Sequence, residues 1–225
     1  MALYSQTEAY GLSLLTEADK SVLSVGISTA GAAEIQMAKG FSGRHVVATT
    51  IDRSGVKLAL DAVKNAGVSS QVEVRFEDIA GNLSYPDGSF DFIYARLVLH
   101  YLSKQQLEQA LANIGRILRG GGRLFVVVRS TDCLEAKDAR SQYDPSTCLT
   151  TYYCIGRPNN TATRYFHSDT SITDALGRHG FSVDALGHVQ EALAFGFVRD
   201  KLSTHKDDLI QLVAHKKEQT NAYDF

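Results

Sequence analysis

Short apolar runs alternate with amphipathic stretches along the first 128 residues of the chain. The apolar runs are bounded by turn residues, which favours strands covered on both faces. We expect these strands over 21–25, 45–51, 90–95 and 124–128, and residues 71–76 alternate like a strand near the edge of the sheet. Between them, helix-forming residues and apolar residues at helical spacing predict helices over 32–39, 56–65 and 104–118. This alternation of strand and helix predicts an α/β fold, with a parallel sheet and helices on both faces.

The pattern changes after residue 128. Residues 129–168 are polar and rich in Thr, Tyr and Asp, which predicts a long loop that is functional or partly disordered. A short helix over 171–179 and two strands over 181–189 and 209–215 are expected to close the domain. A helical lead-in over 1–20 and a frayed tail over 216–225 complete a single domain spanning 1–225, because the chain shows no internal repeat.

Composition narrows the class of protein but not its chemistry. Hydrophobic residues make up 44% of the chain and charged residues 21%, as in an ordinary soluble protein. The formal net charge of −2 does not favour a nucleic-acid partner. No apolar run approaches the ~18 residues of a membrane span, and no basic leader precedes an apolar core. We therefore expect a cytoplasmic protein without a membrane segment.

The three cysteines, Cys133, Cys148 and Cys154, indicate neither a disulfide framework nor a zinc site. Cys148, Cys154 and His167 could converge on a metal, but their spacing matches no common ligand pattern. We predict no metal, and expect the cysteines to behave as small apolar side chains in a reducing compartment.

The segment 85–102, YPDGSFDFIYARLVLHYL, is the most informative stretch of the chain. A Pro-Asp-Gly-Ser turn leads into an apolar strand, and Arg96 follows at the strand's carboxyl end, where open α/β sheets bind ligands. This segment resembles the fourth-strand motif of class I S-adenosylmethionine (SAM)-dependent methyltransferases. The resemblance extends over about 22–216 and implies a Rossmann-like, seven-stranded, mostly parallel sheet with an antiparallel last strand. It also implies SAM as cofactor, with Arg96 beside it.

Residues 24–31, SVGISTAG, stand where this family has an acidic-x-Gly-x-Gly-x-Gly loop. Gly26 matches the first glycine, whereas Ser28 and Ala30 fill the next two positions and Ser24 replaces the acid. Small residues are needed where backbone and cofactor nearly touch. In the family the acid helps to hold the methionine portion of SAM. The resemblance thus implies Gly26 and Ser28 as cofactor-binding residues.

Further cofactor contacts are implied at the ends of the second and third strands. The ribose-binding acid of the family falls on Thr50 or Asp52, with Ile51 between them. A carboxylate can accept hydrogen bonds from both ribose hydroxyls, whereas a threonine can make only part of that contact. Alternatively, Asp52 could cap the following helix. Asp78 matches the family's acceptor for the adenine amino group and Ile79 the apolar neighbour of the ring. The alternative for Asp78 is a solvated turn acid.

We expect the substrate at the carboxyl ends of the fourth and fifth strands. His100 is the candidate general base near neutral pH; the alternative is a hydrogen-bonded residue at a partly buried helix start. Arg129 could bind an acidic group bidentately or pair with Asp132. The substrate candidates are His100, Tyr101, Arg129, Tyr165 and His167.

Two functions follow from the resemblance. The first is a SAM-dependent methyltransferase with a small-molecule acceptor. The second is a catalytically inactive, methyltransferase-fold binding module or partner subunit, which the substitutions at Ser24, Ser28 and Ala30 favour. Asp78 and the intact fourth-strand motif support the enzyme. A nicotinamide-dependent dehydrogenase is disfavoured because the first loop lacks GxGxxG. No oligomeric state is predicted.

Overall fold

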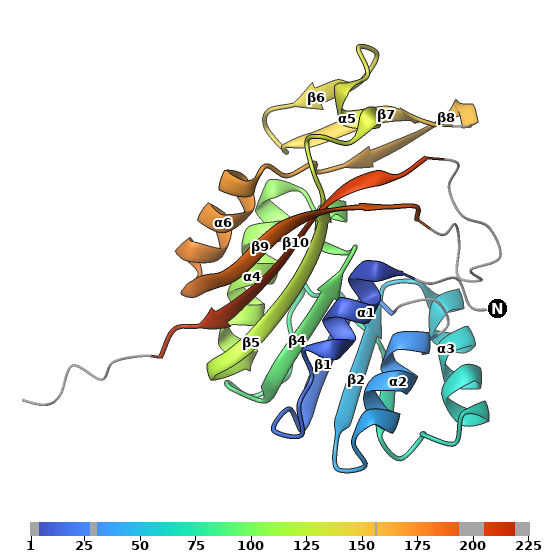
Figure 1. The fold of residues 1–225 in the computed structure, drawn as a ribbon, viewed down its shortest axis with the longest axis vertical. Helices are drawn as coiled ribbons and strands as arrows, with labels where there is room; N and C mark the ends of the chain where they lie inside the picture. The colour runs from blue at the N-terminus through green and yellow to red at the C-terminus, as the bar shows by residue number, and fades with distance from the viewer. Residues whose placement is uncertain (1–4, 28–30, 156, 194–204, 219–225) are drawn as a thin grey trace, which may run out of the picture.

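The computed structural model of the chain describes residues 5–27, 31–155, 157–193 and 205–218 (Figure 1). Seven strands form one sheet in the order β3-β2-β1-β4-β5-β10-β9. Their bounds are β1 (Ser21–Val25), β2 (His45–Thr50), β3 (Val72–Phe76), β4 (Phe90–Arg96), β5 (Leu118–Arg129), β9 (Phe181–Glu191) and β10 (Asp207–Lys216). The helices are α1 (Gln6–Ser13), α2 (Ala32–Gly40), α3 (Arg53–Asn65), α4 (Lys104–Ile117), α5 (Leu134–Lys137) and α6 (Asp169–Arg178), with a 3-10 turn η2 (Leu99–Tyr101).

The sheet has the predicted topology. β1 pairs in parallel with β2 and with β4, and β4 pairs in parallel with β5. β10 runs antiparallel to both β5 and β9, which confirms the antiparallel last strand and its hairpin. The chain order reverses between β1 and β4, and in open α/β sheets ligands bind outside the carboxyl ends of the strands at such a switch point.

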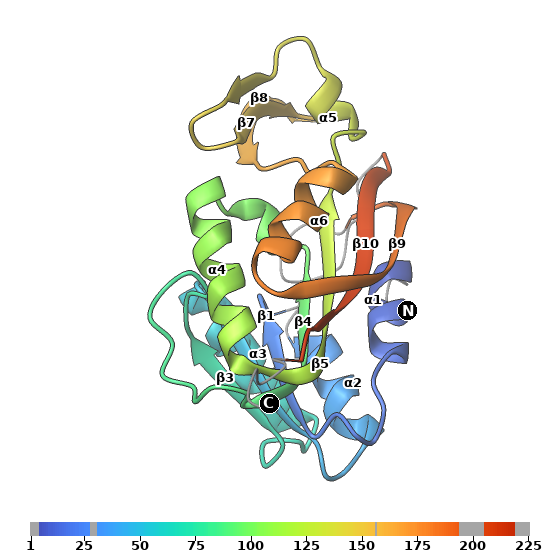
Figure 2. The ribbon, with the colours of Figure 1, turned by 90° about the vertical axis from the view of Figure 1, so that its left-hand side faces the viewer.

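Helices cover both faces of the sheet, as the alternating pattern predicted (Figures 1 and 2). Phe92 and Tyr94 pack with buried residues of α2 and α3, whereas their neighbours Ile93 and Ala95 pack with those of α4 and α6. Successive residues of a strand point to opposite faces, so a continuous apolar run is what a doubly covered strand requires. No helix among the described residues has the length and apolarity needed to cross a membrane.

Helix α1 lies on the same face as α2 and packs against the sheet through Gly11. A β-carbon at Gly11 would lie 2.6 Å from Cε2 of Tyr94 and would also overlap the ring of Phe125. Only a residue without a side chain therefore lets this helix approach the sheet so closely.

The prediction of a long loop over 129–168 is wrong. This stretch contains α5 and a three-stranded antiparallel sheet of β6 (Gln142–Asp144), β7 (Leu149–Cys154) and β8 (Arg157–Arg164). Figure 1 shows this small sheet beyond one end of the main sheet. Threonine and tyrosine favour strands, and β7 alternates buried Thr150 and Tyr152 with exposed neighbours. The strand pattern is hard to see in the sequence, because the small sheet contributes few apolar side chains.

Two helices differ in detail from expectation. The apolar side of α4 is buried, but α4 ends at Ile117, one residue before the predicted end, and the Gly120–Gly122 run lies within β5. In α3 the buried positions are Gly55, Ala59 and Val63, and Leu60 is left 49% exposed.

Candidate functional site

Two unusual backbone turns shape the carboxyl edge of the sheet at the switch point. Gly26, after β1, has φ +77°, and Leu97, after β4, has φ +55°. A positive φ is uncommon for a residue with a β-carbon, and such conformations concentrate at functional sites. The turn at Leu97 brings Val98 against the first loop, where a β-carbon at Gly26 would lie 3.0 Å from Cγ2 of Val98. The need for glycine at position 26 thus arises within the chain's own packing.

Ser24 has a buried partner that sequence reasoning missed. Its hydroxyl donates a 2.6 Å hydrogen bond to Oε1 of Glu34, in the first turn of α2, and both residues are 0% exposed. The available signal was a lone acid in the largely apolar helix segment AAEIQMA. The predicted cofactor residue Ser28, together with Ala30, lies outside the described residues.

The end of β2 combines local hydrogen bonding with one exposed apolar side chain. Oδ1 of Asp52 accepts hydrogen bonds from the backbone N–H groups of Ser54 at 2.8 Å and Gly55 at 3.3 Å, so Asp52 caps α3, as the alternative interpretation expected. Oγ1 of Thr50 accepts a hydrogen bond from the N–H of Asp52 at 3.1 Å. Ile51 is 70% exposed at this edge. Ribose binding by Thr50 and Asp52 stays a prediction.

The end of β3 adds a second exposed apolar surface. Phe76 pairs in register with Thr50 and is 50% exposed. The Arg53 guanidinium lies over its ring, 4.4 Å from the ring centroid. Sequence reasoning missed Phe76, although an aromatic residue at a strand's carboxyl end was a usable signal. Asp78 is exposed and accepts a 2.9 Å hydrogen bond from the N–H of Ala80, whereas Ile79 is only 6% exposed. The exposed apolar surface at this edge is therefore formed by Ile51 and Phe76, and not by Ile79.

Arg96 joins α1 to the sheet. Its Nε donates to Oγ1 of Thr7 at 2.8 Å, and its Nη2 donates to Oγ of Ser5 at 2.8 Å and to Oε1 of Glu191 at 3.0 Å. Glu191 also accepts from the N–H of Thr7 at 3.0 Å and from its hydroxyl at 2.8 Å. Burial opposes ionisation of Glu191, but hydrogen bonds and the charge of Arg96 outweigh it and lower the pKa of Glu191. The predicted cofactor contact of Arg96 therefore competes with internal partners at Nε and Nη2.

Two buried histidines meet at the carboxyl ends of β4 and β5. His100, in η2, is 2% exposed, and its carbonyl accepts a 2.8 Å hydrogen bond from the N–H of Tyr165. His167 follows β8 but bridges to Ser130, just after β5, and is 0% exposed. Within the described part of the chain, Nδ1 of His100 and Nε2 of His167 have no hydrogen-bond partner. Buried polar atoms in this state are rare and call for an explanation.

The protonation of these histidines differs from the expectation for His100. Burial and, secondarily, the charges of Arg164 and Arg129 hold the pKa of His100 well below 6.5. Burial lowers the pKa of His167 to about 3. Both imidazoles are therefore neutral at pH 7, and His100 is not the base titrating near neutral pH that its sequence position predicted.

Aromatic rings surround this pair. Tyr165 stacks on His167 with 4.0 Å between ring centroids, and Tyr101 stacks on His100 at 4.7 Å. Tyr101 is 54% exposed, and the Arg164 guanidinium lies 3.8 Å from its ring centroid. The structure thus brings four of the five predicted substrate residues together, with Arg164 at their exposed side.

The fifth, Arg129, is occupied elsewhere. Its Nη1 donates to the Tyr152 hydroxyl at 2.8 Å, and its Nη2 pairs with Asp207 and, at 2.9 Å, with Glu135. Arg129 does not pair with Asp132, which instead binds Lys137 at 2.7 Å. Arg129 therefore fastens the small sheet and β10 to the end of β5, and its side chain is 8% exposed.

Two groups of acidic and histidine side chains have ligand-type atoms within 4.8 Å of one another: Asp132, His188 and Asp208, and Glu135, His205 and Asp207. In the first group, Nδ1 of His188 is 2.6 Å from Asp208 and its Nε2 is 2.9 Å from Asp169. The second already contains the guanidinium of Arg129. Internal contacts thus account for both groups.

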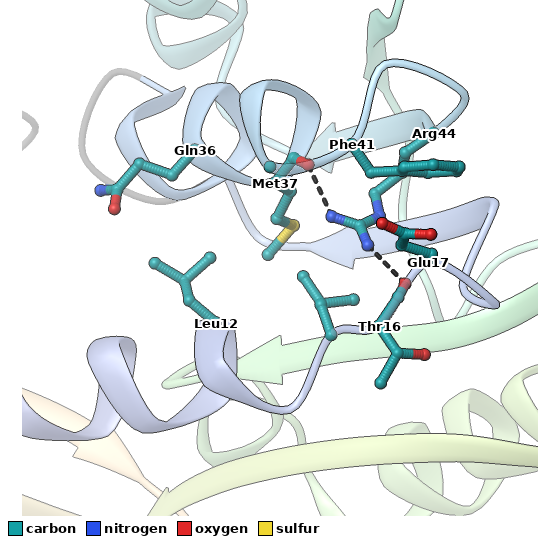
Figure 3. A pocket seen from close by; sticks show the side chains of 9 residues that line it. Leu12, Thr16, Glu17, Gln36, Met37, Phe41 and Arg44 are labelled. Carbon is teal, nitrogen blue, oxygen red and sulfur yellow. Dashed lines mark hydrogen bonds between the residues drawn. The ribbon is translucent and has the colours of Figure 1, made fainter.

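A pocket of about 280 Å³ lies away from this edge, between the end of α1 and α2 (Figure 3). Leu12, Met37 and Phe41 line it, beside Arg44. Arg44 donates to the carbonyls of Met37 at 2.7 Å and Thr16 at 2.6 Å, and these bonds are drawn in Figure 3. Because Thr16 and Arg44 precede β1 and β2, the pocket faces the amino ends of these strands.

The chain is similar to known methyltransferases. Residues 23–126 match a family described as "Methyltransferase domain". The 27-O-demethylrifamycin SV methyltransferase of Amycolatopsis mediterranei is 34% identical over 99 residues, which is 42% of this chain and 35% of that protein. The ubiquinone/menaquinone biosynthesis C-methyltransferase UbiE of Escherichia fergusonii is 33% identical over 96 residues, 43% of this chain and 37% of that protein.

The sequence match therefore spans only about a third of the length of these curated relatives. The likeness of fold is wider. A crystal structure of a SAM-dependent methyltransferase from Methanosarcina mazei superposes with a TM-score of 0.74 at 19% identity, covering 96% of this chain and 99% of that one. The fold is shared over nearly the whole chain, whereas the match to the methyltransferase-domain family ends within β5.

Proposed function

We propose that this chain is a class I SAM-dependent methyltransferase that transfers the methyl group of SAM to a small-molecule acceptor. The observation that carries the proposal is the arrangement at one edge of the sheet. The exposed apolar ends of β2 and β3 and the Gly26 turn adjoin the switch point, and the neutral pair His100 and His167 lies beyond β4 and β5.

The cofactor side of this edge fits an adenosine group. The exposed faces of Ile51 and Phe76 provide apolar contact for a ring, and Asp78 is an exposed acceptor beside them. We assign the ribose to Thr50 and Asp52, both of which already accept hydrogen bonds from backbone N–H groups. A carboxylate can accept several hydrogen bonds, so capping by Asp52 leaves acceptor capacity.

When bound, SAM supplies a methyl carbon on a positively charged sulfur, which leaves as a neutral thioether as the acceptor bonds to that carbon. The chain's residues must then align the acceptor and exclude water. His100 and His167 are buried and neutral, because burial keeps their pKa values low, and they support the stacked rings of Tyr101 and Tyr165, which we assign to the acceptor side of the site. The nearby charge of Arg164 favours an acceptor that carries or develops negative charge.

A second candidate is a non-catalytic partner subunit with the same fold. Ser24 in place of an acid and the internal contacts of Arg96 and Arg129 favour it. This candidate predicts that the protein has no acceptor, whether or not it binds the cofactor.

Calorimetric titration with SAM and S-adenosylhomocysteine tests the proposal. We expect binding in the micromolar range, which is about −8 kcal/mol. Ile51→Asp should weaken it at least about tenfold by placing a charge where an apolar contact is needed. Leu60→Asp, the same change at an exposed site on α3, should leave it unchanged. A folded protein that binds neither ligand would contradict the proposal.

Methyl transfer is then followed as label passing from SAM to acceptors that bear hydroxyl or carboxylate groups. His100→Phe and His167→Phe should lower turnover without a matching loss of SAM affinity. Cofactor binding without label transfer to any acceptor would favour the partner subunit.

A further inference from the structure

The end of β8 holds Arg164 over an exposed ring at the carboxyl edge of the main sheet. Arg164 is the last residue of β8, and the next residue, Tyr165, donates its N–H to the carbonyl of His100 at 2.8 Å. This hydrogen bond fastens the end of β8 to η2, which follows β4. The Arg164 guanidinium lies 3.8 Å from the ring centroid of Tyr101, a residue that is 54% exposed. The cation is thus fixed on the acceptor side of the site.

The chain uses only one nitrogen of this guanidinium. Nη1 of Arg164 donates to the carbonyl of Thr163 at 2.6 Å. Within the described ranges of the chain, Nε and Nη2 of Arg164 have no hydrogen-bond acceptor, and no carboxylate lies within 4 Å of the group. An arginine side chain stays protonated in proteins, and its Nε and Nη2 carry parallel N–H donors. Arg164 therefore presents a charged, unoccupied pair of donors beside an exposed ring.

Other arginines that lie over tyrosine rings show what this pair of donors binds in the same chain. Arg140 lies 4.9 Å from the ring centroid of Tyr153, and its Nε and Nη2 donate to the two oxygens of Asp138 at 3.0 and 2.6 Å. Arg75, also over a tyrosine ring, donates in the same way to the two oxygens of Glu73 at 2.7 and 3.0 Å. The end of β8 presents this arrangement without an acid of the chain in it.

The chemistry of the free donors selects a carboxylate. A guanidinium matches the two oxygens and the single charge of a carboxylate in a bidentate pair. A phosphate monoester brings close to two charges and three acceptor oxygens, more than one unpaired guanidinium offsets.

The neighbouring side chains select an aromatic ring to carry that carboxylate. Tyr143 of β6 and Arg164 of β8 both pair in register with Thr150, and residues that pair directly lie on the same face of a sheet. Tyr143 is 60% exposed and Tyr101 is 54% exposed. Exposed tyrosine rings thus lie on the same side as the free donors, and aromatic pairs are favourable beyond the area that they bury.

We propose that the acceptor is an aromatic acid whose carboxylate is bound by Nε and Nη2 of Arg164, with Tyr101 and Tyr143 in contact with its ring. This inference rests on the proposed function and names the substrate class of its acceptor side. The ligand supplies to Arg164 the carboxylate that Asp138 supplies to Arg140.

Matched acids and amides test the charge that the site requires. Benzoate and 1-naphthoate, with benzamide and 1-naphthamide, are titrated into the protein in the presence of S-adenosylhomocysteine and followed by ligand-observed NMR. We expect both acids to bind with dissociation constants of about 1 mM or lower, and the amides at least about tenfold more weakly, because they lack the charge that strengthens the two hydrogen bonds. Equal affinities of acid and amide would overturn the inference, as would a failure of both acids to bind.

Variants assign the preference for acids to Arg164. Arg164→Gln should abolish the preference, and Arg164→Lys, which keeps the charge but not the two parallel donors, should keep only part of it. Arg140→Gln is the matched control, because this stacked arginine already holds Asp138, and it should leave the preference unchanged. The preference is a ratio of two affinities for one folded protein, so partial unfolding does not mimic its loss. An unchanged ratio in Arg164→Gln, or an equal loss in Arg140→Gln, would overturn the assignment.

Two further outcomes separate this inference from its alternatives. Phenyl phosphate that binds more tightly than benzoate and depends equally on Arg164 would mean that the site takes a phosphate, which overturns the carboxylate. A wild type that binds SAM but does not distinguish acids from amides overturns only this inference. A folded wild type that binds no SAM overturns the proposed function, and the acceptor role of Arg164 with it, even if the acids bind.

Discussion

Val98 occupies the space that a side chain at Gly26 would need. A β-carbon there would lie 3.0 Å from Cγ2 and 3.1 Å from Cβ of Val98. Val98 reaches this position because Leu97 adopts φ +55° directly after β4. The first loop and the end of β4 therefore fit together before any ligand is considered, which explains a glycine at position 26 even though the next glycines of the family's loop are replaced here.

Gly26→Ala should destabilise the protein more than backbone strain alone would. Gly67 provides the matched control, because it has φ +72° and a β-carbon there would meet nothing within 4 Å. Strain at positive φ costs about 1–2 kcal/mol, so Gly67→Ala should lose about that amount in urea unfolding. Gly26→Ala should lose about 1 kcal/mol more from the contact with Val98. Gly26→Ala/Val98→Ala should not show this additional clash. Equal losses of stability for Gly26→Ala and Gly67→Ala would contradict the contact between position 26 and Val98.

Alanine should have opposite effects at two helical glycines. Gly177, in α6, faces open space, so Gly177→Ala should raise the free energy of unfolding by about 0.5–1 kcal/mol through helix propensity. Gly11, in α1, touches Tyr94 and Phe125, so Gly11→Ala should lower it despite the same gain in propensity. Urea unfolding of both variants measures the difference. A stabilised Gly11→Ala would mean that α1 does not pack on these rings.

The Arg96–Glu191 pair should make a pH-dependent contribution to stability. The folded pKa of Glu191 lies below its ordinary 4.5, so the contribution is complete above that value and is lost as pH falls through the folded pKa. Glu191→Gln should cost about 3 kcal/mol at pH 7, because it leaves a buried arginine without its partner. The cost should shrink below pH 4.5 in urea titrations.

A surface pair provides the control for Arg96 and Glu191. Asp87 pairs with Arg116 but its side chain is 80% exposed, so Asp87→Asn should cost less than about 1 kcal/mol. A similar small cost for Glu191→Gln would show that α1 is not held by this network.

His167 and His188 should give slopes of opposite sign in stability against pH. Burial lowers the folded pKa of His167 to about 3, so the unfolded chain binds the extra proton and stability falls as pH drops below 6.5. His167→Gln should remove a slope of about 1.4 kcal/mol per pH unit between pH 6 and 4. The hydrogen bond to Asp208 raises the pKa of His188; burial opposes this rise, and the hydrogen bond to Asp169 adds to it. The contribution of His188 to stability is therefore present below pH 6.5 and is lost as pH rises through the folded pKa.

Urea unfolding of His167→Gln and His188→Gln at several pH values checks this. His188→Gln should lower stability at acidic pH more than at alkaline pH. An unchanged slope in His167→Gln would mean that His167 is protonated, or exposed, in the folded protein.

The local pattern of the chain was sufficient for the main sheet. The apolar run 21–25 is β1 to the residue, and the other predicted strands of the main sheet overlap β2, β3, β4, β5, β9 and β10. A strand that is covered on both faces must be apolar on both, so its burial is visible in the sequence as a continuous apolar run. The antiparallel last strand followed from the resemblance, and the pairing of β10 with β5 and β9 confirms it.

The roles of single polar residues were decided only by the tertiary structure. Arg96 meets Thr7 and Glu191, Arg129 meets Asp207 instead of Asp132, and Ser24 meets Glu34 because helices and strands distant in sequence pack together. The small sheet over 142–164 was missed for the same reason, since its strands gain stability from pairing with one another and not from an apolar pattern of their own. Hydrophobic periodicity reports which face of an element is buried, but a hydrogen bond or ion pair depends on which neighbour arrives there. The sequence by itself therefore determined the architecture of the main sheet, and the packing of α1, α2 and β10 decided which charges stabilise the fold and which are left to the site.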